Sequence, residues 1–288
     1  MSQEKVHFSE KLSPLLVSTL KIGMVSCLGK FCSVISNTIK NLLYTEDIDL
    51  FVEQIAMGSG ETGENTRQKV WGSTEIEYAF MFTFKKVNAL KLEDIKPFFR
   101  TLPVDPYIKG NYRYRRLSRF TISNDELIKL PHGYLYQSKN YNPLLGDIKR
   151  EFAELDEELL KLDSFRKMVL AFSDSCKLHP EAEIGIHQIR TTCSPNNYGN
   201  PAPEGIHRDG TDFIGIFSVD RDNIQGGETH LYLERKAKPV FRKVLNPGEL
   251  LLVNDHEFLH FTTPVKPQLE QQGTRDVFVL TSPSLISD

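Results

Sequence analysis

Apolar residues recur at three- and four-residue steps over two stretches of the chain, and this spacing predicts helices there. The first stretch lies within residues 1–51. The second, residues 151–172, is clearer: its apolar positions form one stripe with Glu and Lys on the opposite side, as in a helix that packs on a sheet. The stripe consists of Phe152, Leu155, Leu159, Leu162, Phe165, Val169 and Phe172.

After about Glu181 the pattern changes to short runs with the composition of β-strands, separated by turn residues such as Gly226-Gly227 and Asn246-Pro247-Gly248. Evenly spaced short strands with glycine and proline between them favour a barrel or a jelly roll. The predicted strands cover residues 184–190, 213–219, 229–234, 249–253 and 277–281.

Two further strands are predicted before this region. Residues 76–84 alternate loosely, and residues 111–116 alternate aromatic and basic side chains, so that Arg113 and Arg115 share one face. We therefore expect a fold that is mainly β with flanking helices. A single catalytic domain would span residues 1–288, with a helical and mixed supporting segment at 1–180 and the β core at 181–288; a separate N-terminal domain remains the alternative.

Composition narrows the function classes. The 288 residues are 40% hydrophobic and 25% charged, as in an ordinary globular protein, and the net charge of −3 argues against a broad contact with nucleic acid or an anionic membrane. The four cysteines form no CxxC pair, and no segment reads as a membrane span or a secretory signal. We expect a cytoplasmic protein in a reducing compartment that acts on a small molecule.

One short segment suggests a metal site. His207 and Asp209 lie two positions apart, and in extended backbone such positions point to the same side, so the imidazole and the carboxylate converge. Far downstream, His260 stands near the end of a predicted strand. Two imidazoles and one carboxylate on one side of a metal are typical of non-haem Fe(II). His256, in a polar run four residues earlier, is an alternative to His260.

A buried cation accompanies these ligands. Arg275 enters an otherwise apolar strand fifteen residues after His260. A buried arginine without an anion is costly, and the planar guanidinium matches a carboxylate bidentately. A metal isomerase or hydrolase of the cupin kind, or a non-catalytic jelly-roll binding protein, remains an alternative. However, the first needs no carboxylate-binding arginine, and the second needs no complete ligand set.

The order HxD, distal His and then Arg resembles that of the Fe(II)/2-oxoglutarate-dependent dioxygenases. A longer string, residues 184–283, is similar to one branch, the bacterial L-isoleucine hydroxylase-like enzymes, which act on free L-amino acids. The matching pieces are His187-Gln188-Ile189-Arg190, residues 201–210 (PAPEGIHRDG) and Gly226-Gly227-Glu228.

The resemblance implies a double-stranded β-helix (jelly roll, cupin-like) with catalytic iron held by His207, Asp209 and His260. The cosubstrate 2-oxoglutarate would chelate the iron and pair its distal carboxylate with Arg275, and O2 would take the last coordination position. The products would be succinate, CO2 and a hydroxylated amino acid, with aliphatic side chains the first expectation. A peptide, a protein or a carrier-bound substrate is the alternative within the same chemistry.

A free amino acid presents an ammonium and a carboxylate, so its pocket needs an anion and a cation. Glu204 and Asp212 are the candidate anions near the metal segment, and Arg113, Arg115 and Arg116 are candidate cations, with Arg115 preferred. Gln188 and Arg190 share a strand face in the family-like string and are further candidates. The proposed substrate-binding set is Gln188, Arg190, Glu204, Asp212 and Arg115.

Overall fold

The computed structural model describes residues 82–287, which belong to one compact unit of the chain, Tyr78–Asp288. The predicted helical stretch within residues 1–51 lies outside the described residues. So does most of the strand predicted at 76–84, whose last three residues begin strand β1 (Phe82–Lys86). Among residues 82–287, the helices are all too short or too polar to span a bilayer.

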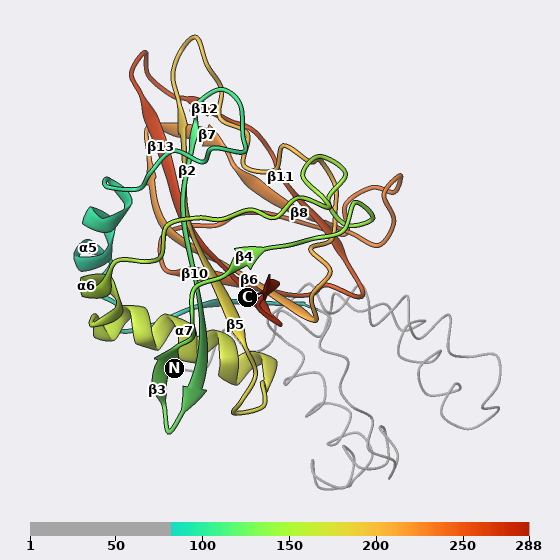
Figure 1. Ribbon diagram of the computed structural model, residues 1–288. Coiled ribbons are helices and arrows are strands. Elements are labelled where there is room, and N and C mark those ends of the chain that lie inside the picture. The colour runs from blue at the N-terminus through green and yellow to red at the C-terminus, as the bar shows by residue number, and fades with distance from the viewer. Residues whose placement is uncertain (1–81, 288) are drawn as a thin grey trace, which may run out of the picture. The chain divides into compact units, whose positions relative to one another are not determined.

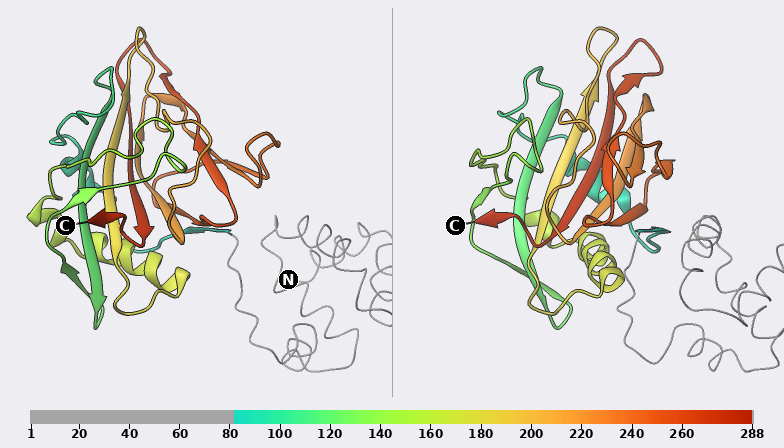
Figure 2. Two further views of the ribbon diagram at one scale, coloured as in Figure 1. Left: turned by 45° about the vertical axis from the view of Figure 1, so that its right-hand side comes forward. Right: turned by 90° about the vertical axis from the view of Figure 1, so that its right-hand side faces the viewer.

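A seven-stranded antiparallel sheet organises the fold, in the order β1-β10-β6-β13-β5-β2-β3 (Figure 1). Its strands come from both sides of residue 180, and the long strands β2, β5 and β13 run side by side (Figure 2). Beside β1, the strands are β2 (Arg113–Ser123), β3 (Glu126–Lys129), β5 (Ile184–Cys193), β6 (Phe213–Asp222), β10 (Glu249–Asn254) and β13 (Gly273–Ser282).

Smaller sheets complete the β-structure. One has the order β11-β8-β9 and shares an apolar cluster with the large sheet, in which Leu231 and Phe258 contact Ile214 and Leu251. Two further pairs are β12 with β7 and β14 with β4. Their bounds are β4 (Tyr134–Leu135), β7 (Ile224–Gly226), β8 (Glu228–Tyr232), β9 (Phe241–Val244), β11 (Leu259–Thr262), β12 (Val265–Pro267) and β14 (Ile286–Ser287).

Helices cover one face of the large sheet. They are α5 (Leu92–Ile95), the 3-10 helix η1 (Lys96–Phe99), α6 (Glu157–Leu160) and α7 (Asp163–Cys176). The main core lies between these helices and the sheet, where Phe165 and Phe172 of α7 pack with Phe278. A Cβ at Gly215 of β6 would lie 2.6 Å from the Phe172 ring, so glycine there lets α7 approach the sheet closely.

The prediction of one helix over residues 151–172 is wrong in two respects. Its N-terminal end is not helical, and the remainder is divided into α6 and α7, with Leu162 extended between them. Residues 151–156 are extended, and their backbone pairs with β2: Leu117 N donates to Ala153 O at 2.9 Å. Asp156 then caps α6, its Oδ1 accepting from Glu158 N at 2.9 Å. The apolar residues of the extended part are buried by packing against β2, and their spacing merely coincides with a helical period.

Candidate active site

One pocket opens on the face of the large sheet opposite α7. Alternate residues of β5, namely His187, Ile189 and Thr191, line this pocket, while Ile184 and Ile186 of the same strand face the core under α7. The same alternation along β13 directs Arg275 into the pocket. The strands of the large sheet therefore separate an apolar core on one side from a strongly polar cavity on the other.

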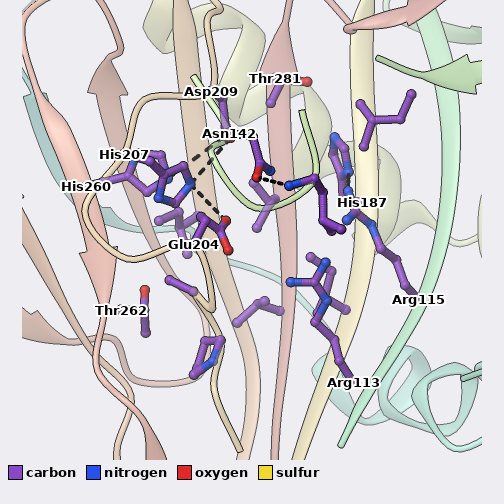
Figure 3. Close-up of a pocket in the computed structure, with 18 of the residues that line it drawn as sticks. Arg113, Arg115, Asn142, His187, Glu204, His207, Asp209, His260, Thr262 and Thr281 are labelled. Carbon is purple, nitrogen blue, oxygen red and sulfur yellow. Dashed lines mark hydrogen bonds and ion pairs between the residues drawn. The ribbon is translucent and has the colours of Figure 1, made fainter. Parts of the chain in front are cut away.

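His207, Asp209 and His260 meet in this pocket, with ligand atoms all within 4.8 Å of one another (Figure 3). The backbones of His207 and His260 exchange two hydrogen bonds, of 3.1 and 2.8 Å, between the loop that follows β5 and strand β11. This bridge holds the two imidazole centroids 4.2 Å apart. His207 Nε2 lies 3.6 Å from Asp209 Oδ1, and His260 Nε2 lies 3.9 Å from Asp209 Oδ2.

The donor atoms of this cluster fit a divalent metal. His207 Nδ1 donates to Gly205 O at 2.8 Å, which leaves Nε2 as the unprotonated ligand atom in the metal-bound form. Gln137 Nε2 donates to Asp209 Oδ1 at 3.0 Å and orients that carboxylate. Two imidazole nitrogens and one carboxylate form the set that suits Fe(II).

The charges in the cluster also favour a cation. Burial disfavours ionised Asp209, but the hydrogen bond with His207 and the nearby histidines outweigh it and hold the pKa of the carboxyl well below its usual range. Burial also opposes protonation of His207, yet Asp209 and Glu204 raise its pKa to about 9. Burial and the His207 charge lower the pKa of His260 to about 3. Without a metal, His207 is therefore protonated at neutral pH and His260 is not. A bound metal ion would displace the extra proton from His207.

Asp255 fixes the loop that carries Asp209. Its buried carboxylate accepts the backbone N–H groups of Asp209, Gly210 and Thr211 at 3.2, 2.7 and 3.1 Å. The same carboxylate lies 3.9 Å from Nδ1 of His260, which makes no hydrogen bond within residues 82–287. Asp255 thus fixes the backbone around one metal ligand, Asp209, and lies next to a second, His260.

Replacing Asp255 by alanine is expected to lower the affinity for Fe(II) by roughly 10–100-fold, because groups that orient metal ligands contribute on this scale. Anaerobic calorimetry with Fe(II) measures the change. Asp174→Ala, on the exposed side of α7, is the control and should bind the metal as the wild type does. An unchanged affinity in a folded Asp255→Ala protein would show that the loop holds its position without the carboxylate.

Arg275 lies buried in the pocket, 4% exposed, and its guanidinium makes no hydrogen bond or ion pair with any other residue in 82–287. The adjacent Asp276 points to the opposite face, where its two oxygens bind Arg190 at 2.7 and 2.6 Å. Burial and the Arg221 charge lower the pKa of Arg275 to about 9, so the guanidinium is still charged at neutral pH. An anionic ligand would satisfy it.

Glu204 and Arg115, two of the predicted substrate residues, line the pocket. Glu204 Oε1 lies 3.1 Å from His207 Nε2. Arg115 donates to His187 Nδ1 and stacks 4.5 Å over the Phe152 ring. The predicted anion therefore lies next to a metal ligand, and the predicted cation lines the same pocket.

The other three predicted substrate residues do not line the pocket. Gln188 and Arg190 do share a face of β5, but it is the face turned to α7: Gln188 is fully buried there and Arg190 pairs with Asp276. Asp212 is exposed and binds His256 at 2.8 Å. This pairing holds His256 at the surface, apart from the metal-ligand cluster.

A loop after β4 brings residues to the pocket that the sequence did not indicate, among them Gln137, Asn142 and Arg150. Gln137 Oε1 accepts from Arg150 at 2.7 Å and from Asn142 at 3.2 Å, while its amide nitrogen donates to Asp209. The guanidinium only donates and the carboxylate only accepts, so the orientation of the Gln137 amide is determined. No periodicity marks this loop, and only the folded chain places it here.

Residues 96–281 match the sequence model of a family described as 2OG-Fe dioxygenase, and the chain belongs to this family. It is a 2-oxoglutarate-dependent iron dioxygenase that uses Fe(II), 2-oxoglutarate and O2, which confirms the predicted enzyme class. A curated relative is the 3(1)-hydroxy-L-isoleucine 4-dioxygenase of Pantoea ananatis (strain AJ13355), 26% identical over 215 residues that cover 70% of this chain and 85% of the relative. The predicted isoleucine hydroxylase-like branch is thereby confirmed.

Solved structures support the same fold. A bsmA homologue from Methylobium petroleophilum PM1 superposes with a TM-score of 0.59 at 30% identity, covering 67% of this chain and 81% of the other. The structure of IDO from Bacillus thuringiensis gives 0.60 at 16% identity, with 72% and 94% covered. The prediction of a mainly β, jelly-roll protein with flanking helices is confirmed.

Proposed function

We propose that this dioxygenase hydroxylates a free L-amino acid, with iron held by His207, Asp209 and His260. One observation carries the proposal: a single pocket contains the three ligands, the unpaired Arg275, and both an anion and a cation, Glu204 and Arg115. A small zwitterion bound near the metal needs such a pair of charges, because each of its groups loses water on binding.

His207, Asp209 and His260 would hold Fe(II), which would supply the activation of O2. The overall reaction would convert 2-oxoglutarate to succinate and CO2 and a substrate C–H bond to an alcohol, with one oxygen atom of O2 in succinate and the other in the alcohol. The chain binds and orients the reactants. Arg275 pairs with the distal carboxylate of 2-oxoglutarate, and Asp255 and Gln137 hold the ligand Asp209 in place. Apolar side chains of the pocket wall exclude water from the reacting centre, among them Ile189, Ile216, Val277 and Val279.

The same wall supports an aliphatic side chain in the substrate. Leu145 and Ile216 contribute apolar surface, and Glu204, beside the metal ligand His207, is placed to accept the ammonium. The Pantoea relative is named for an isoleucine derivative, which agrees in chemical class with this pocket. Arg115 supplies the complementary cation for the carboxylate.

A panel of the twenty free L-amino acids, assayed for succinate release with Fe(II), 2-oxoglutarate and ascorbate, is expected to show stimulation by one or a few aliphatic members. N-acetylated and amidated forms of the active amino acid should stimulate poorly, because each removes one recognised charge. If no free amino acid stimulates release while a peptide or a carrier-bound amino acid does, the proposal is wrong and the larger substrate takes its place.

A further inference from the structure

Three buried arginines besides Arg275 line the pocket: Arg113, Arg115 and Arg150. Arg113 is neutralised by Asp105, its Nε donating to Oδ2 at 2.8 Å. Arg115 and Arg150, 6% and 2% exposed, have no carboxylate partner within residues 82–287. Figure 3 shows Arg113 and Arg115 with His187 across the pocket from His207 and His260.

Several polar atoms around these two arginines lack a hydrogen-bond partner in the described part of the chain. They are Nε of Arg115, Nε of Arg150, Nε2 of His187 and Oγ1 of Thr191. Burial and the Arg115 charge lower the pKa of His187, so this imidazole is neutral. It accepts a hydrogen bond from Arg115 but supplies no negative charge to balance the arginines. Leaving buried donors and charges without partners is unfavourable, which indicates that an anionic ligand completes this region.

The cosubstrate alone cannot satisfy all the buried cations. In the family chemistry one end of 2-oxoglutarate chelates the iron, which leaves one distal carboxylate, and Arg275 is available for it. The guanidinium groups fall into two sets along the sheet. Arg275 of β13 lies next to Arg221 of β6, whereas Arg113 and Arg115 lie on β2, on the other side of the intervening strand β5. A second anion is therefore needed at the Arg115 and Arg150 set.

We propose that Arg115 and Arg150 form a second carboxylate-binding site, separate from Arg275, which takes the α-carboxylate of the substrate. This inference rests on the proposed function and extends it: the substrate must carry a free carboxylate. A guanidinium pair around one carboxylate gives charge-assisted hydrogen bonds on both of its oxygens.

The position of this site relative to the iron follows from one glutamine. Arg150 donates to Gln137 Oε1 at 2.7 Å, and the Gln137 amide nitrogen donates to Asp209 Oδ1 at 3.0 Å. The carboxylate site is thus tied through Gln137 to a metal ligand, and Glu204 lies on the metal side of the pocket. A substrate held at both ends would present a fixed part of its side chain to the iron.

The test measures binding without turnover, on the protein loaded with Mn(II) and 2-oxoglutarate. Three probes are compared by thermal melting: L-isoleucine, isovalerate, which has a carboxylate and no ammonium, and L-isoleucinamide, which lacks the carboxylate. A ligand that binds only the folded state raises the melting temperature with its concentration. L-isoleucine and isovalerate should stabilise the wild type, and the amide should not.

Arg150→Met and Arg115→Met are expected to raise the half-saturating concentration of isovalerate by about tenfold or more. Methionine at position 115 keeps an apolar contact with Phe152. Arg115→Met therefore tests the carboxylate site even if replacement of the fully buried Arg150 prevents folding. Arg150→Lys, which keeps the charge and loses the fork, should bind with intermediate strength. Arg116→Met is the matched control, because Arg116 lies on the opposite face of β2 and donates to Glu154 O.

Calorimetry with 2-oxoglutarate completes the test. The affinity of Arg115→Met and Arg150→Met for 2-oxoglutarate should stay close to that of the wild type. The proposal is overturned if neither carboxylate probe stabilises the wild type, or if both variants lose 2-oxoglutarate as strongly as Arg275→Ala does. If isovalerate binding depends on Arg150 while no free amino acid supports succinate release, the carboxylate site stands and the proposed function fails.

Discussion

Alanine in place of His207, Asp209 or His260 is expected to abolish succinate release. Each change removes one of three ligand groups that converge within 4.8 Å, and the remaining two hold a metal weakly. The loss of Fe(II) affinity should exceed the ~10–100-fold caused by losing an outer, orienting group. None of the three side chains belongs to an apolar core cluster of the described residues, so the variants should remain folded.

His256→Ala is the control for the histidine variants. His256 lies at the surface, bound to Asp212, and its loss should leave succinate release unchanged. Circular dichroism and the melting temperature check that every variant is folded. Full consumption of 2-oxoglutarate in any two of the three ligand variants would refute the assignment of the iron site.

Arg275→Ala is expected to raise the half-saturating concentration of 2-oxoglutarate by tens-fold or more, since losing a buried, charge-assisted pair costs about 2–5 kcal/mol. Steady-state succinate release over a range of 2-oxoglutarate concentrations measures this. Arg275→Lys should restore affinity only in part, because an ammonium group cannot make the two parallel hydrogen bonds of a guanidinium.

Arg190→Met provides the matched control for Arg275. Arg190 lies on the neighbouring strand, but it is bound to Asp276 on the face turned to α7. Its loss should lower the free energy of unfolding and leave the affinity for 2-oxoglutarate unchanged. An unaltered half-saturation in Arg275→Ala would assign the distal carboxylate to another cation of the pocket.

Local spacing predicted much of the site because side chains two positions apart point to the same side, both on strand β2 and in the loop segment that carries His207 and Asp209. Two-residue alternation put His207 with Asp209, and Arg113 with Arg115, and both pairs line the pocket. Alternation specifies which side chains share a face but not which face that is. Gln188 and Arg190 do share one face of β5, but it is the face turned to the helices. Their neighbour His187 is on the other face and lines the pocket.

Long-range contacts account for what the sequence did not predict. Asp255 binds three backbone groups around Asp209, and Gln137 and Arg150 reach the pocket from a loop more than fifty residues before His207. Neither the loop nor the turn that carries Asp255 has a hydrophobic period, so nothing local indicates which segment each one meets. In residues 151–156 a local pattern was misleading. Their apolar spacing matches a helical period, but the backbone is extended and hydrogen-bonds to β2.

Anaerobic addition of equimolar Fe(II) and then 2-oxoglutarate tests the account most directly, because a 2-oxo acid chelated to Fe(II) gives a visible charge-transfer absorption. The wild type should develop this band, and it should be lost in His260→Ala and require far more 2-oxoglutarate in Arg275→Ala. A band of full intensity in His260→Ala, or none in the wild type, would contradict the assignment of His207, Asp209 and His260 as the iron ligands.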